Sequence, residues 1–204
     1  MKTKIAVFVS GGGTNLQALI DAERGGALPS GEIVLVISSS GGAYALERAR
    51  QAGIPTAVCS RRALGSREAF ECAISAALKE YGVEMIVLAG FMSILSEHFT
   101  ARWPKRIINV HPALIPSFCG RGMYGLRVHE AVLAYGVKVT GATVHYVNEI
   151  PDGGEILLQK AVAVEVDDTP ETLQRRVMEQ AEWLLLPQAA QLVAERIRKE
   201  KTND

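Results

Sequence analysis

Two polar residues at the end of an apolar run are the strongest candidates for chemistry in this sequence. Residues 107–110 predict a buried strand that carries Asn109 and leads into His111, after which Pro112 ends the pattern. Residues i and i+2 of a strand point to the same face, so the two side chains should lie side by side. An amide donor and a titratable imidazole could then act on one substrate atom. The alternative is a capped strand end with a purely structural histidine.

A third candidate is Asp152, which lies in the turn at residues 150–154. An aspartate in a turn most often only caps backbone N–H groups. Beside His111, however, its carboxylate would orient the imidazole and stabilise its charged form, so we expect it to raise the histidine pKa. The remaining histidines have no ligand-spaced partners and predict no metal site: His98, His129 and His145.

Two loops complete the candidate site. The turn Ser10–Asn15 is rich in glycine and precedes a predicted helix, where backbone N–H groups and the helix dipole favour an anion. It lacks the lysine of a P-loop and the third glycine of a dinucleotide motif, so it predicts a phosphate site or a plain tight turn. The apolar loop Ala89–Leu95 could line a slot for a flat heteroaromatic ligand, or it could simply pack into the core.

The elements that must position these residues alternate between short apolar runs and helical patterns. Ser66 is the expected N-cap of the longest predicted helix. This rhythm predicts an α/β fold, with a Rossmann-like, open, mostly parallel twisted sheet and helices on both faces. Ligands of such sheets bind at the carboxyl ends of the strands. The predicted strands are 5–9, 33–37, 56–59, 85–89 and 107–110, and the predicted helices are 15–24, 43–52 and 66–81.

The pattern changes after Pro116. Residues 138–147 and 156–164 predict a C-terminal antiparallel strand pair around the turn that contains Asp152. Residues 170–199 are helical in pattern, and Pro187 is expected to bend or break that segment. A single domain over residues 1–204 is the simpler interpretation, although two small domains are not excluded.

Composition narrows the function classes. Lys plus Arg and Asp plus Glu both number 22, so the formal net charge is zero and the electrostatic footprint of a nucleic-acid binder is missing. The N-terminal apolar run of five residues is too short for a signal peptide or a membrane span. We therefore expect a soluble, cytoplasmic protein with no nucleic-acid or membrane partner. The cysteines are expected to be reduced thiols outside any metal site: Cys59, Cys72 and Cys119.

Four segments together resemble one enzyme family. Residues 10–19, 89–95, 109–116 and 152–154 are similar, in the same order, to the motifs of the folate-dependent glycinamide ribonucleotide formyltransferase family. The similarity runs from about residue 4 to Pro187. The Asn-x-His-Pro segment and the distant aspartate are shared by a wider group of formyl-folate enzymes, and the first loop is what indicates this particular family.

The resemblance implies transfer of a formyl group from 10-formyltetrahydrofolate, as co-substrate, to the amine of 5-phosphoribosylglycinamide in purine biosynthesis, with no metal. Asn109 and the other two reacting-centre residues, His111 and Asp152, would be catalytic. Residues 1–100 would be the phosphate-binding half, and residues 101–204 the folate-binding and catalytic half. The folate would contact Asn109 together with these residues: Arg67, Met92, Ser93, Ile94 and Leu95.

The resemblance also implies a phosphoribosyl site. Gly13, Thr14 and Asn15 would hold the ribosyl phosphate. A glutamate that touches this substrate in the family matches Glu182. The chain carries one extra residue between Arg176 and Pro187, so Glu179 is the alternative.

Two departures and several alternatives stay open. Ser93 stands where an arginine is common, and residues 118–129 are longer than in many relatives, so the substrate-side loop is not placed. Formyltetrahydrofolate deformylase would use water in place of the amine, but often has an extra N-terminal domain. Methionyl-tRNA formyltransferase is longer and more basic. A non-catalytic sugar-phosphate-binding protein would leave Asn109, His111 and Asp152 unexplained. The protein could be a monomer or a homodimer.

Overall fold

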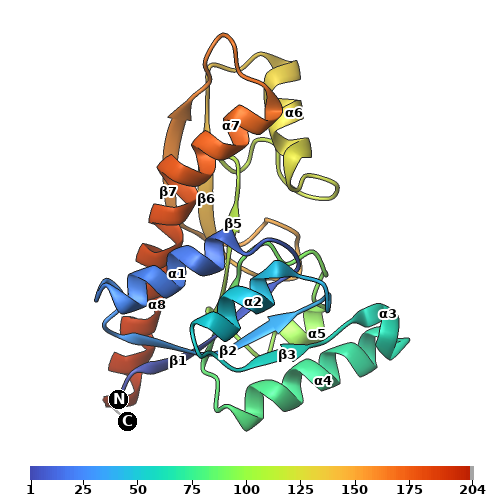
Figure 1. The fold of residues 1–204 in the computed structure, drawn as a ribbon, viewed down its shortest axis with the longest axis vertical. Coiled ribbons are helices and arrows are strands. Elements are labelled where there is room, and N and C mark those ends of the chain that lie inside the picture. The colour runs from blue at the N-terminus through green and yellow to red at the C-terminus, as the bar shows by residue number, and fades with distance from the viewer. Residues whose placement is uncertain (203–204) are drawn as a thin grey trace.

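The strands of the chain form one sheet (Figure 1). The computed structural model describes residues 1–202, in which seven strands are ordered β3-β2-β1-β4-β5-β6-β7. The pairs from β3 to β5 are parallel, whereas β6 runs antiparallel to both β5 and β7. This confirms the predicted Rossmann-like sheet with its antiparallel C-terminal pair. The strands are β1 Thr3–Val9, β2 Gly31–Ser38, β3 Thr56–Val58, β4 Met85–Leu88, β5 Ile107–His111, β6 Val139–Tyr146 and β7 Ile156–Ala163.

The helices cover both faces of this sheet. Ser66 caps α4 as predicted, because its side chain accepts a hydrogen bond from the Ala69 N–H at 3.0 Å. Three helices lie outside the segments predicted as helical: α3, α5 and the helix α6 that follows the long loop. The helices are α1 Thr14–Arg24, α2 Tyr44–Gln51, α3 Arg61–Leu64, α4 Arg67–Glu80, α5 Glu97–Thr100, α6 Leu126–Tyr135, α7 Pro170–Val177 and α8 Trp183–Thr202.

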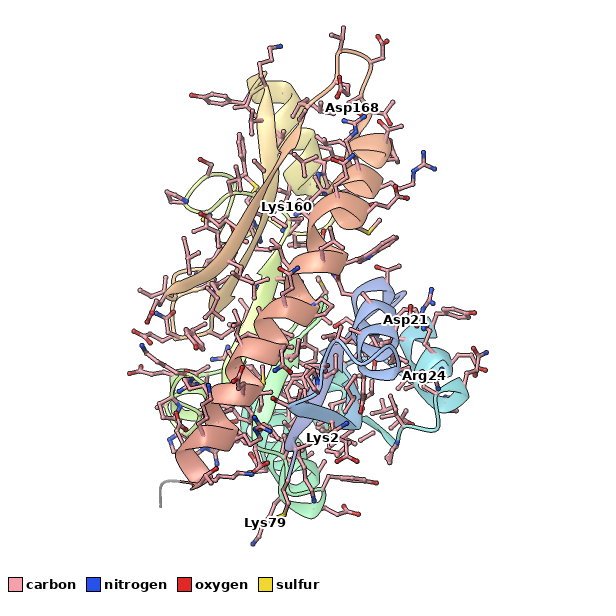
Figure 2. All side chains as sticks on the ribbon, turned by 90° about the vertical axis from the view of Figure 1, so that its left-hand side faces the viewer. Lys2, Asp21, Arg24, Lys79, Lys160 and Asp168 are labelled. Atoms are coloured by element: carbon pink, nitrogen blue, oxygen red, sulfur yellow. The ribbon has the colours of Figure 1, made fainter. Side chains whose placement is uncertain are left out.

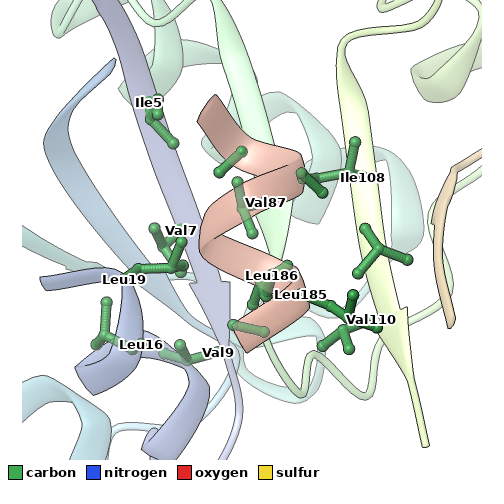
Figure 3. Close-up of a cluster of buried hydrophobic side chains, with 14 of the residues drawn as sticks. Ile5, Val7, Val9, Leu16, Leu19, Val87, Ile108, Val110, Leu185 and Leu186 are labelled. Atoms are coloured by element: carbon green, nitrogen blue, oxygen red, sulfur yellow. The ribbon is translucent and has the colours of Figure 1, made fainter. Parts of the chain in front are cut away.

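Alternate residues of β1 enter two different cores. Ile5, Val7 and Val9 pack against α1 and α8 on one face, as Figure 3 shows, whereas Ala6 and Phe8 pack with α4 and α5 on the other. This is the two-residue period of a strand that is buried on both sides. The carboxyl ends of the parallel strands are thereby fixed between two rigid helical layers.

The C-terminal helical segment differs from its prediction. It runs along one face of the molecule without a break at Pro187, which lies inside α8 (Figure 2). The irregularity falls earlier, at the π-helical turn η1, Met178–Glu182, between α7 and α8. A π turn accommodates one extra residue in a continuous helix and is frequent at functional sites. We therefore expect the extra residue that the resemblance implies between Arg176 and Pro187 to be absorbed in η1.

Within residues 1–202, none of the helices has the length and apolar character that crossing a membrane requires.

Candidate functional site

Asn109 and His111 share one face of β5, as their spacing predicts. Ile108 and Val110 point into the core under α1 and α8, so the two polar side chains point to the opposite face. His111 is the last residue of β5, one residue beyond the predicted strand, and is only 3% exposed. The pair thus stands at the carboxyl edge of the sheet, where the two side chains can act together.

Asp152 is brought to this pair by a tight turn. Its carboxylate lies 3.6 Å from His111 Nδ1 and 3.6 Å from His145 Nε2. Asp152 has φ 56°, and a Cβ on Gly154 would come within 1.7 Å of the Tyr146 carbonyl oxygen. Only glycine therefore lets the turn pack this closely on β6, which fixes the carboxylate between the two imidazoles.

His145 is a site residue that the sequence analysis missed. It lies opposite Asn109 in the β5–β6 register, and its Nε2 is 3.3 Å from the Asn109 amide nitrogen. Its Nδ1 is 2.8 Å from the Tyr146 carbonyl oxygen, which can only accept, so Nδ1 carries the proton. In that tautomer Nε2 accepts one hydrogen of the Asn109 amide, which leaves the other amide hydrogen for a ligand. The register that joins these residues is not readable from either strand alone.

The loop between β5 and α6 closes over the same cluster. His111 Nε2 donates to the Phe118 carbonyl oxygen at 2.8 Å, and the Gly120 N–H donates to Asp152 Oδ2 at 2.9 Å. This places the segment 118–129, which the sequence left unplaced. Because Nε2 of His111 carries the proton, Nδ1, facing Asp152, is the ring atom that can take up another.

The expected charge of His111 is corrected by its burial. Burial is the largest influence and lowers the pKa of His111 below its usual value, although Asp152 and the Phe118 carbonyl oppose it. The prediction that Asp152 raises this pKa above the reference is therefore wrong in its net direction. Burial also acts to raise the pKa of Asp152, but the contact with His145, the charge of His111 and the Gly120 N–H outweigh it and lower that pKa. The site thus pairs a neutral imidazole with an ionised carboxylate.

The glycine-rich turn meets the sheet edge at the start of α1. Gly13 has φ 74°, and a Cβ there would lie 2.6 Å from the Ala45 Cβ, so only glycine fits. Arg48 donates from Nε to the Gly12 carbonyl oxygen at 2.9 Å and holds the turn from α2. Thr14 begins α1, and the first N–H groups of a helix have no partner within it. These donors are what an anion needs.

Asn15 points inward and binds a residue of η1. Its amide nitrogen donates to Glu182 Oε2 at 2.6 Å, and Glu182 is only 6% exposed. Burial raises the pKa of Glu182, against the effect of this hydrogen bond. Glu179 is instead exposed and faces Arg175 at 4.0 Å. Of the two glutamates considered from the sequence, only Glu182 thus meets the glycine-rich turn.

The apolar loop borders a cavity beside the candidate catalytic residues. A cavity of about 120 Å³ is lined by Ser93, Ile94 and Leu95 together with Asn109, His145 and Asp152. Met92 lies in the same loop but is 54% exposed and outside the lining. Arg67, the first residue of α4, is exposed and also outside it. The structure therefore joins most of the predicted folate residues, but not these two, to the catalytic candidates.

A second cavity lies away from Asn109, His111 and Asp152. A cavity of about 550 Å³ lies between α1 and α8 and shares only Thr14 with the predicted site residues. This cavity is lined by none of Asn109, His111, His145 and Asp152, so the smaller cavity is the better candidate for chemistry. Across residues 1–202, no group of three or more histidine, cysteine, aspartate or glutamate residues could hold a metal ion.

The fold and the site together define a class of protein, a Rossmann-like α/β enzyme with an amide, two imidazoles and a carboxylate at the carboxyl edge of its sheet. Residues 3–189 match the family model described as formyl transferase. That match covers most of the chain, which therefore belongs to the formyl transferase family.

Relatives agree with this assignment. The chain is 48% identical over 193 residues to the trifunctional purine biosynthetic protein adenosine-3 of Gallus gallus, covering 95% of this chain but only 18% of that protein. It is 42% identical over 184 residues to the phosphoribosylglycinamide formyltransferase of Haemophilus influenzae, covering 90% of this chain and 84% of that protein. The crystal structure of glycinamide ribonucleotide transformylase 1 from Symbiobacterium toebii superposes with a TM-score of 0.88 at 42% identity, covering 96% of this chain and 89% of that one.

Proposed function

We propose that this chain transfers the formyl group of 10-formyltetrahydrofolate to the amine of 5-phosphoribosylglycinamide in purine biosynthesis. The observation that carries the proposal is that Asn109 and Asp152 line one cavity at the sheet edge, with His111 Nδ1 3.6 Å from the Asp152 carboxylate. The names of the relatives support the same reaction. A non-catalytic sugar-phosphate-binding protein would not need a carboxylate held between two buried imidazoles.

Asn109 is proposed to stabilise the oxyanion. The substrate amine attacks the formyl carbon, a C–N bond forms, and the carbonyl oxygen takes the negative charge. One amide hydrogen of Asn109 binds His145, and the other remains to donate to this oxygen. A fixed donor at a developing oxyanion lowers a barrier by about 3–4 kcal/mol.

His111 is proposed to move the proton. The attacking nitrogen must lose one proton, and the departing N10 of the folate must gain one when its C–N bond breaks. A neutral His111, whose pKa is lowered by burial, can accept this proton at Nδ1 and return it to N10. Asp152 stabilises the imidazolium in between because its carboxylate faces that atom. His145 positions both Asn109 and Asp152.

The two substrates are proposed to occupy neighbouring subsites. The turn Gly13–Asn15 would hold the ribosyl phosphate through helix N–H groups, and Glu182 would meet the ribosyl part of that substrate. The loop Met92–Leu95 with Asn109 would bind the folate head, while Arg67, exposed on α4, would meet its charged tail. The proposal has two further parts. Residues 1–100 and 101–204 form the two halves of one formyltransferase domain, joined by the contact between Asn15 and Glu182. The protein is a cytoplasmic monomer or homodimer.

Mass analysis of the products tests the proposed reaction. The protein is incubated with both substrates, with each alone, and as the variant His111→Ala. The proposal predicts a formylated glycinamide ribonucleotide only when both substrates and the unaltered protein are present. Release of free formate from the folate alone would support the deformylase instead. Absence of any formyl loss in every mixture would refute the catalytic proposal.

A further inference from the structure

Ser10 joins the two proposed substrate loops. It is the first residue after β1 and the first of the glycine-rich turn, and its hydroxyl accepts a hydrogen bond from the Met92 N–H at 2.9 Å. The same hydroxyl lies 2.7 Å from the hydroxyl of Ser39, which follows β2. Because Met92 already uses an acceptor position of Ser10 Oγ, the proton of Ser10 is free to bind Ser39. Loops from three neighbouring strands thus meet at one side chain.

Few hydrogen bonds hold the backbone of the loop Phe91–Leu95. Within residues 1–202, the bond to Ser10 is the one hydrogen bond that a backbone N–H of this loop donates. Beyond the loop, Ser96 donates from both its N–H and its hydroxyl to the buried Glu71 carboxylate, at 2.6 Å each. One end is therefore fixed to α4. The other is held by the ring of Phe91, whose centroid lies 5.2 Å from that of Phe8, and by the hydrogen bond to the glycine-rich turn.

The glycine-rich turn is held differently. The Ala45 N–H donates to the Gly11 carbonyl oxygen at 3.0 Å, and Arg48 donates to that of Gly12. An anion bound at Gly13–Asn15 adds contacts to the backbone of the same turn, whose first residue is Ser10. Ordering of this backbone fixes the Ser10 hydroxyl, and the hydroxyl fixes the Met92 N–H.

We infer that Ser10 is a positioning residue that couples the two substrate sites, so that the phosphoribosyl substrate and the folate strengthen each other's binding. This inference rests on the proposed function, because it needs both ligands at their proposed loops. Coupling between sites is reciprocal, so each ligand must raise the affinity for the other by the same factor. A typical coupling is about 5- to 150-fold.

Calorimetry with a non-reacting pair of ligands tests this inference. Tetrahydrofolate and 5-phosphoribosylglycinamide carry no formyl group, so their ternary complex cannot turn over. The affinity for tetrahydrofolate is measured with and without the second ligand for the unaltered protein, Ser10→Ala and Ser10→Thr. Thr169→Ala is the matched control, since Thr169 also accepts from a backbone N–H, at 3.3 Å from Thr172, but caps α7.

The outcomes separate this inference from the proposed function. We expect coupling of at least about fivefold in the unaltered protein, Thr169→Ala and Ser10→Thr, and coupling within about twofold of none in Ser10→Ala. Equal coupling in Ser10→Ala and the unaltered protein overturns the inference, as does binding of both ligands without any coupling. An unaltered protein that binds neither ligand counts against the proposed function instead.

Discussion

Replacing Glu182 tests the contact between η1 and the glycine-rich turn. Glu182→Ala leaves the Asn15 amide, which is 8% exposed, without its partner at 2.6 Å. A buried donor left unpaired costs about 1–3 kcal/mol, and the space left by the side chain adds to that. In a domain of about 200 residues each kcal/mol lowers the melting temperature by about 2–4 °C. We expect Glu182→Ala to melt at least about 4 °C below the unaltered protein in a calorimetric scan.

The isosteric variant Glu182→Gln should behave differently. Its amide oxygen still accepts from Asn15, but it cannot ionise. The pKa of Glu182 is raised in the folded state, so its contribution to stability is present at low pH and is lost as pH rises through that raised pKa. The unaltered protein should therefore lose stability on this rise while Glu182→Gln does not. The melting temperature of Glu182→Gln relative to the unaltered protein should increase with pH.

Glu179→Ala is the control for both experiments. Glu179 is exposed in the same π-helical turn, so its removal should change the unfolding free energy by no more than about 0.5 kcal/mol. Equal melting temperatures for Glu182→Ala and Glu179→Ala would refute the argument from the burial of Glu182. A difference in melting temperature between Glu182→Gln and the unaltered protein that does not change with pH would refute it too. If Glu182 also meets the substrate, Glu182→Ala should raise KM for 5-phosphoribosylglycinamide and Glu179→Ala should not.

Three further predictions concern the catalytic cluster and the phosphate turn. Asp152→Asn removes the charge that raises the pKa of His111, so the acid limb of kcat, which reports loss of neutral His111, should move to lower pH. The value of kcat should also fall by about 10²-fold or more. An unmoved acid limb in the pH–rate profile would count against His111 as proton carrier. Gly154→Ala should displace Asp152 because its Cβ meets the Tyr146 carbonyl, so kcat should drop although Asp152 is retained, and a fully active Gly154→Ala would contradict the turn argument. Thr14→Ala should leave kcat largely unchanged, since backbone N–H groups supply most of the anion binding, and should raise KM for the phosphoribosyl substrate only; loss of kcat at unchanged KM would reverse that division.

The parts of the site that follow local rules were predictable. The strand period placed Asn109 and His111 on one face, and the switch from short apolar runs to longer alternating ones predicted the antiparallel β6 and β7. The glycine-rich turn was expected before a helix because the residues that indicate the start of that helix, Gly13 and Thr14, are adjacent in the sequence.

The parts that depend on long-range packing were not predictable. His145 joins the cluster only through the β5–β6 register, which neither strand specifies by itself. The pKa of His111 follows from how deeply the fold buries it, and the carboxylate nearby indicated the opposite direction. Pro187 predicted a bend or a break, but the packed face of α8 keeps that helix continuous, and the irregular turn η1 lies earlier in the chain.

At this cluster an amine, and not water, is proposed to take the formyl group. The most direct test follows 10-formyltetrahydrofolate labelled with ¹³C at the formyl carbon by NMR, in the presence of 5-phosphoribosylglycinamide. We expect the labelled carbon to appear in an amide of the phosphoribosyl product, and we expect Asn109→Ala, His111→Ala and Asp152→Asn each to slow this transfer. Label that appears as free formate at the same rate with and without the amine would contradict it.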